Sequence, residues 1–356
     1  MWDNILGNEQ HKKFLEHYLQ SDARPHALLF VGPAGLGKRR LALAFAKSLL
    51  CFKSPLLRGE GQGASFQTSG LNGGRQPDVE ELGQDDCQSC RQFSNGVHPD
   101  FVEVTLEEGK KSLTIEQVRD LIAGSAFAPT LSSNKVILLN DVDLLRVEAA
   151  NALLKILEEP PESWTLVLTA THEERILPTI LSRVVTLRFR PLTDDQVLQI
   201  FSGQVKDETQ GAVYAKLAEG SIGTALEMAE RNALELRQNA LGLLQSLPTK
   251  VPLNLATAVI GGLDSVKQLE REPVLLWLRL LQQLLRDVLF LKLGIAGVYN
   301  EDLVFELKKV AACGSLQSWQ RALAGVERAY GALNGNVGLK QILEQLVLDI
   351  NKVLID

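Results

Sequence analysis

Apolar and polar positions divide the chain into two parts with different periodicities. In residues 1–190, short runs of consecutive apolar residues alternate with stretches in which apolar residues recur every three or four positions. The short runs predict buried strands at 27–31, 101–105, 135–140, 164–171 and 185–189. The other stretches predict helices at 9–20, 39–50, 112–122 and 148–159, the third of them beginning at a capping Thr114. This alternation favours an α/β fold with a mostly parallel sheet covered on both faces.

Residues 191–356 show helical periodicity only. Helices are predicted at 193–201, 210–217 and from Thr224 to about Leu247, and from residue 253 to the end. The Leu-rich stretch 272–293 is typical of a protein core or a partner interface rather than of a cofactor site. The chain is therefore predicted to contain three parts: an α/β domain at 1–191, a small helical unit at 192–235 and a helical domain at 236–356.

Composition limits the classes of function. At 356 residues the chain is long enough for two or three domains. A formal net charge of −6 argues against tight autonomous binding to nucleic acid, which depends on Lys and Arg neutralising phosphates. No apolar run has the length of a membrane span, and the first residues lack the layout of a signal peptide. A cytoplasmic protein without a membrane partner is expected.

The first predicted strand runs directly into a glycine-rich loop. Gly32-Pro-Ala-Gly35-Leu-Gly37-Lys38 stands between a strand and a helix, which is the setting of a phosphate-binding P-loop. Such a loop points backbone N–H groups at phosphate oxygens, and its lysine adds a positive charge. The motif has Ser or Thr after the lysine to ligate Mg²⁺, whereas this chain has Arg39, whose guanidinium has donors only and cannot ligate a cation.

The strand at 135–140 ends in polar residues. In P-loop proteins an Asp that orients Mg²⁺ follows a buried strand of this kind. Here Asn140 and Asp141 occupy the end of the strand, and an amide is a poorer magnesium ligand than a carboxylate. The alternative interpretation is a strand followed by an ordinary polar cap. A degenerate Mg²⁺ site and weak or absent ATP binding are therefore expected.

Three cysteines flank a segment of different composition. Residues 52–86 are rich in Gly, Ser and Gln and predict a flexible insertion, with Cys51 before it and the pair Cys87-x-x-Cys90 after it. A Cys-x-x-Cys pair is half of a structural Zn²⁺ site, which needs four ligands. The fourth ligand is Asp85, Asp86 or His98, or none is present and the thiols are simply reduced. Cys313 is predicted to be a small core residue.

Several motifs together resemble the bacterial DNA polymerase III clamp-loader AAA+ family. The family likeness over residues 1–230 lies in Ile5-x-Gly7-Asn8-Glu9, His26-Ala-Leu-Leu-Phe-x-Gly32 with the P-loop, the Cys-x-x-Cys pair before His98-Pro-Asp100, Asn151-Ala-Leu-Leu-Lys155-x-Leu157-Glu-Glu-Pro-Pro161, and Leu181-Ser-Arg183. The resemblance implies a P-loop AAA+ core, a helical lid and an all-α collar that assembles a hetero-pentamer. It also implies a ring that places a sliding clamp on primer-template DNA.

The family that the chain resembles contains motor subunits and a stator subunit, and the residues of the nucleotide site distinguish the two. A motor subunit would have Ser or Thr at Arg39, Asp at Asn140, Glu at Asp141 and a sensor arginine at Gly223. Arg183, which in the family is an arginine finger that reaches the neighbour's ATP, is present. These features imply a non-hydrolysing stator that works with motor subunits and the delta subunit. The alternatives are an ATP-hydrolysing motor subunit and a DNA-binding module built on the cysteines.

Overall fold

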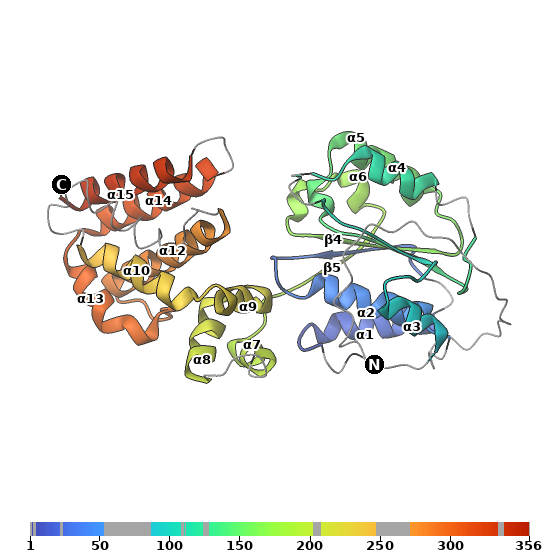
Figure 1. Ribbon diagram of the computed structural model, residues 1–356, viewed down its shortest axis with the longest axis horizontal. Coiled ribbons are helices and arrows are strands. Elements are labelled where there is room, and N and C mark those ends of the chain that lie inside the picture. Colours follow the sequence, from blue (N-terminus) through green and yellow to red (C-terminus); the bar gives the residue numbers. More distant parts are fainter. Residues whose placement is uncertain are drawn as a thin grey trace. The chain divides into compact units, whose positions relative to one another are not determined.

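The computed structural model describes the following residues: 2, 5–21, 24–52, 87–107, 110, 112–123, 128–201, 208–246, 271–333 and 338–355. The insertion predicted at 52–86 lies, except for Phe52, outside the described residues. The chain divides into two compact units, Met1–Leu192 and Thr193–Asp356, which are drawn in Figure 1. The separation of a small helical unit at 192–235 from a domain at 236–356 stays a prediction.

The first unit contains a five-stranded sheet in which neighbouring strands are all parallel. Its order is β2-β3-β4-β1-β5, so that β1 lies between β4 and β5. The bounds are β1 (Ala27–Val31), β2 (Phe101–Val104), β3 (Lys135–Leu139), β4 (Trp164–Ala170) and β5 (Val185–Arg188). The predicted parallel α/β fold is confirmed.

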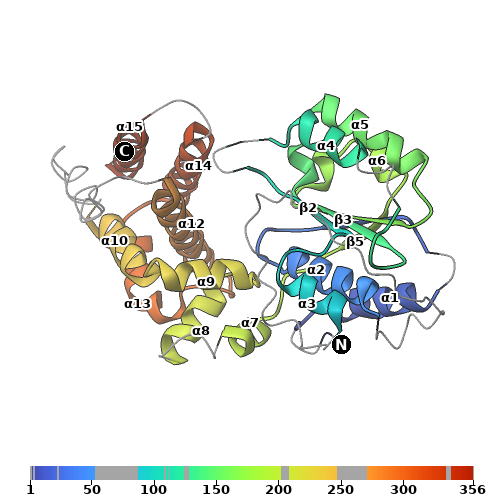
Figure 2. The same cartoon turned by 45° about the vertical axis from the view of Figure 1, so that its right-hand side comes forward.

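Helices cover both faces of this sheet (Figures 1 and 2). One face carries α1 (Glu9–Gln20), α2 (Lys38–Leu50) and α3 (Gln88–Ser94), and the other carries α4 (Ile115–Ala123), α5 (Val147–Glu158) and α6 (Pro178–Leu181). Because side chains alternate along a strand, Leu28 and Phe30 enter the core under α1 and α2. Leu29 and Val31 enter the core with Leu153 of α5. The uninterrupted apolar strands are thus explained by burial on both faces.

A capping box begins α4, as predicted at Thr114. The backbone N–H of Gln117 donates to Thr114 Oγ1 at 3.3 Å, and the N–H of Thr114 donates to Gln117 Oε1 at 3.0 Å. These two bonds satisfy donors that the first turn of the helix leaves without a partner. Two short 3₁₀ turns, η2 (Val142–Leu144) and η3 (Glu173–Arg175), follow β3 and β4.

The described part of the second unit is built from helices alone. Their bounds are α7 (Asp194–Phe201), α8 (Glu208–Leu217), α9 (Ile222–Glu230), α10 (Ala233–Ser246), α12 (Arg271–Leu293), η4 (Glu301–Leu303), α13 (Val304–Ala312), α14 (Leu316–Leu333) and α15 (Leu339–Ile355). Helix α12 packs against α10, α13 and α14. Its Trp277 and the Trp319 of α14 are fully buried in one core.

Two predictions about this unit were wrong. The single helix from Thr224 to Leu247 is two helices, because Asn232 adopts a left-handed conformation with φ 52° that ends α9 before α10 begins. Asn tolerates this conformation better than most residues. Cys313 is exposed rather than buried, since it follows the last turn of α13 on its solvent side, where its thiol bonds Lys309 O.

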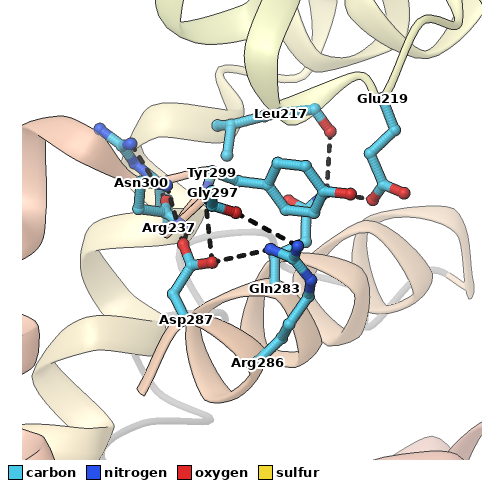
Figure 3. A network of polar contacts seen from close by, with 9 residues as sticks. All are labelled: Leu217, Glu219, Arg237, Gln283, Arg286, Asp287, Gly297, Tyr299 and Asn300. Atoms are coloured by element: carbon cyan, nitrogen blue, oxygen red, sulfur yellow. Dashed lines mark hydrogen bonds and ion pairs between the residues drawn. The ribbon is translucent and has the colours of Figure 1, made fainter. Parts of the chain in front are cut away.

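A polar network inside the second unit connects α8 and α10 with α12 (Figure 3). The fully buried carboxylate of Asp287 accepts hydrogen bonds from the backbone N–H groups of Tyr299 and Asn300 at 3.1 and 2.8 Å. Asn300 in turn accepts a bond from Arg237 of α10. The side-chain amide of Gln283 donates to the carbonyl of Leu217 at 2.8 Å. These contacts join the end of α8 to the helical core.

Candidate functional site

The P-loop forms the turn between β1 and α2. Gly32 has φ 149° and an added Cβ would lie 2.7 Å from the carbonyl oxygen of Phe189, so only glycine fits there. Gly35 and Gly37 also have left-handed φ values, of 74° and 80°. Helix α2 begins at Lys38, with its N-terminus at the loop. The backbone therefore has the shape of a phosphate-binding turn.

Lys38 is folded back onto this loop. Its ammonium donates to the carbonyls of Gly32 and Pro33 at 2.6 and 2.8 Å, and the residue is buried. Burial lowers the pKa of Lys38, and the nearby Asp141 and Asp143 oppose that change. Burial, together with Asp143, raises the pKa of Asp141, while Lys38 lowers it. The lysine and the acids after β3 thus share one electrostatic environment.

Arg39 and Asn140, the two positions where Mg²⁺ ligands are expected, meet at Glu103, a residue that belongs to none of the sequence motifs. Arg39 donates to both carboxylate oxygens of Glu103, from Nε at 2.6 Å and from Nη2 at 3.0 Å. The amide of Asn140 donates to the same carboxylate at 2.7 Å. Glu103 stands on β2, beside β3 in the sheet. The only sequence signal for it is an acid inside an otherwise apolar strand.

Thr169 of β4 fixes the orientation of Asn140. Its hydroxyl donates to Asn140 Oδ1 at 3.0 Å and accepts from the backbone N–H of Asp141 at 3.2 Å. The amide nitrogen of Asn140 is therefore directed at Glu103. An amide held in this way donates a hydrogen bond where a metal site needs an acceptor. We call Arg39, Glu103, Asn140 and Thr169 the Arg39 network.

Gly223, the position where a motor subunit would have a sensor arginine, belongs to the second compact unit. Gly223 lies in the first turn of α9, where Ser221 caps the helix by accepting the N–H of Thr224 at 3.1 Å. It offers no side chain to a phosphate.

The buried Asp143 accepts the backbone N–H groups of Thr171 and His172 at 3.2 and 3.1 Å. It thereby holds the start of the segment that leads from β4 toward Arg183.

Arg183 lies directly after α6, held by residues outside the Arg39 network. Its Nη1 donates to the carbonyl of Thr179 at 2.9 Å and to Ser182 Oγ at 3.2 Å. Its Nη2 donates to Glu158 Oε1 at 2.8 Å. The side chain is 35% exposed. The guanidinium is thus ordered by its own chain and accessible from solvent.

Cys51, Cys87 and Cys90 come together as the spacing predicted. All three are buried, and their sulfur atoms lie within 4.8 Å of one another. Cys51 Sγ is 3.8 Å from Cys87 Sγ, and none of the three is in a disulfide. The thiol contacts with Cys51 and Cys87, together with burial, raise the pKa of Cys90. Three thiols at this separation fit one tetrahedral ion. A bound metal would favour their thiolate form.

His98 is not placed to be the fourth ligand. Its Nε2 contacts Ser89 Oγ at 3.0 Å, and its Nδ1 accepts the backbone N–H of Asp100 at 3.1 Å. Both ring nitrogens are therefore used inside the protein. Asp85 and Asp86, the other residues considered for this role, lie outside the described residues.

Comparison with known proteins decides the family. A family model described as "DNA polymerase III, delta subunit" matches residues 7–81 and 59–193, which is more than half of the chain. This chain belongs to the clamp-loader family of DNA polymerase III delta' subunits. The resemblance inferred from the motifs is thereby confirmed.

Within the part of the chain that the structure describes, no helix has the length and apolar character needed to cross a membrane.

Relatives of this family differ in how much they share with the chain. The DNA polymerase III delta' subunit of Pseudomonas aeruginosa is 35% identical over 52% of this chain and 45% of its own length. The tau subunit of Bacillus subtilis is 29% identical over 67% of this chain and 38% of its own length. The match thus spans less than half of these two relatives. The delta' subunit of Bacillus subtilis is 26% identical over 94% of each chain.

Proposed function

We propose that this chain is the stator of a bacterial sliding-clamp loader, a delta' subunit that does not hydrolyse ATP itself. The observation that carries this proposal is the Arg39 network. A working P-loop ATPase holds Mg²⁺ with a Ser or Thr hydroxyl and an Asp carboxylate. Here the two positions carry Arg39 and Asn140, and both donate to Glu103. The chain's own charges satisfy one another where a metal would bind, so ATP binding is weak or absent.

The second half of the proposal gives Arg183 the role of an arginine finger that acts on a neighbouring subunit's ATP. An arginine supplied in trans stabilises transition-state charge and is worth about 10³–10⁵ in rate. Of the five N–H donors of a guanidinium, three have partners among the described residues, which leaves two for a phosphate. The partial exposure of Arg183 makes those two donors accessible to another chain.

The relatives, which are named tau, gamma and delta' subunits of DNA polymerase III, support other clamp-loader subunits as partners. We infer assembly with motor subunits and a delta subunit into a cytoplasmic hetero-pentamer. Residues 236–356 would form the collar and 192–235 the lid. The sliding clamp and primer-template DNA would be contacted through this assembly. A net charge of −6 agrees with DNA contacts that depend on the assembly rather than on this chain alone.

The cysteine cluster is proposed as a structural Zn²⁺ site. Cys51 follows α2, whereas Cys87 and Cys90 belong to the start of α3, so that a shared ion would fasten the two helices together. A structural zinc ion contributes folding free energy and takes no part in catalysis.

The second candidate is an ATP-hydrolysing motor subunit, which the likeness to tau subunits and the presence of Lys38 support. Phosphate release by the isolated chain with ATP and Mg²⁺ separates the two candidates. A stator shows no release above that of a Lys38→Ala control. Robust turnover that Lys38→Ala abolishes would replace the stator proposal with the motor one.

A further inference from the structure

Glu158, the residue that pairs with Arg183, stands in an unfavourable place for an acid. It is the last residue of α5, and Glu159 follows as the C-cap. The C-terminal end of a helix carries partial negative charge, so carboxylates are disfavoured there and cations are favoured. The chain nevertheless ends α5 with two consecutive acids. The guanidinium of Arg183, at 2.8 Å from Glu158 Oε1, supplies the positive charge that this end of the helix favours.

The pair contributes little to the stability of the fold. The side chains of Arg183 and Glu158 are 35% and 52% exposed, and ion pairs with that much solvent around them are weak. The pair matters more for the orientation of the guanidinium, because the other two contacts of Arg183, with Thr179 O and Ser182 Oγ, both involve Nη1. Glu158 holds the second nitrogen, Nη2. Without it, the guanidinium is anchored through Nη1 alone, and the position of Nη2 is less well defined.

We propose that Glu158 is a positioning residue that fixes the orientation of the Arg183 guanidinium for contact with a neighbour's phosphates. This inference rests on the proposed finger role of Arg183. A catalytic group must be held close to its productive geometry, and small misplacements are costly in rate. The two N–H donors that have no partner among the described residues can reach an anion while Glu158 stays in place. The contact therefore orders the finger and does not need to break.

The test uses the fully assembled clamp loader, with DNA and clamp, and variants of this chain. Glu158→Ala should lower the maximal ATP turnover on the order of fivefold with an unchanged KM for ATP, because the finger acts in the transition state. Glu158→Gln keeps an oxygen that accepts from Nη2 and should restore most of that turnover. Glu159→Ala is the matched control, since no contact of Glu159 with Arg183 occurs among the described residues.

A double variant separates positioning from a structural role. In the Arg183→Ala background, Glu158→Ala should cause no further loss, and size-exclusion chromatography should show intact assemblies throughout. Wild-type turnover in Glu158→Ala, increased turnover, or an equal loss with and without Arg183 would overturn the inference. If Arg183→Ala alone leaves turnover unchanged, the finger proposal itself fails, which is a different result from the failure of Glu158 alone.

Discussion

Arg39 and Glu103 form a two-point ion pair between the first turn of α2 and β2, with donor–acceptor distances of 2.6 and 3.0 Å. Planar contacts of this kind match the guanidinium to a carboxylate in both position and charge. The pair occupies the region where a motor subunit would bring Mg²⁺ ligands together. It gives a physical reason for the proposed absence of ATP hydrolysis, which the residue types alone only suggest.

The first prediction concerns the stability contributed by this pair. Glu103→Ala should lower the free energy of unfolding by about 1–3 kcal/mol, because Arg39 and Asn140 lose their shared acceptor and Glu103 is only 14% exposed. Urea unfolding of the purified chain measures the change.

Glu173→Ala is the control for that measurement. Glu173 makes a similar two-point pair with Arg188, whose side chain is 67% exposed, so the loss should be smaller than that of Glu103→Ala. Equal effects of the two substitutions would contradict the structural role of the Arg39 network.

A second prediction concerns pH and His98. Burial lowers the pKa of His98 below its usual 6.5, although Asp100 opposes that change. The unfolded state therefore binds more protons, so the contribution of His98 to stability is complete above about pH 6.5. It is lost as the pH falls from there toward the folded pKa, because the protonated ring can no longer accept the N–H of Asp100.

The free energy of unfolding, measured from pH 7.5 to 5 in the wild type and in His98→Asn, checks this prediction. It should fall less steeply with decreasing pH in the variant. His11, whose pKa is lowered by burial and by Arg190, contributes with the same sign in both proteins. A profile of equal slope in the variant would contradict the account of His98.

The third prediction concerns the metal. The purified chain should contain about one equivalent of Zn²⁺, and Cys90→Ser should reduce it strongly, because three thiolates are the ligands that the structure brings together. Metal analysis by mass spectrometry gives the content directly.

Cys313→Ser provides the matched control, since Cys313 is exposed and belongs to the other compact unit. Its zinc content should equal that of the wild type. Less than a tenth of an equivalent in the wild-type chain would end the zinc proposal.

The sequence predicted the local features of this molecule well. The strands at Ala27–Val31 and Lys135–Leu139 follow from apolar runs, and the three buried cysteines follow from spacing. What it missed depends on contacts between distant segments. Glu103 looked like one acid in a short strand, and only the neighbouring β3 and α2 show that it joins Arg39 to Asn140.

The break at Asn232 was missed for a local reason. Residues 224–247 keep helical periodicity across it, and a left-handed Asn is one conformation among several that the sequence permits. Cys313 was misplaced because residue type predicts burial only on average, and this cysteine follows the end of a helix.

The proposed division of roles between the P-loop and Arg183 is tested by comparing Lys38→Ala and Arg183→Ala of this chain within the same reconstituted clamp loader. Steady-state ATP turnover and clamp loading onto primed DNA are measured for both. Arg183→Ala should lower turnover by about tenfold or more, because a neighbour loses its transition-state arginine. Lys38→Ala should leave it unchanged, because the proposed stator hydrolyses no ATP at its own P-loop. Unchanged turnover with Arg183→Ala, or a large loss with Lys38→Ala, would contradict the account.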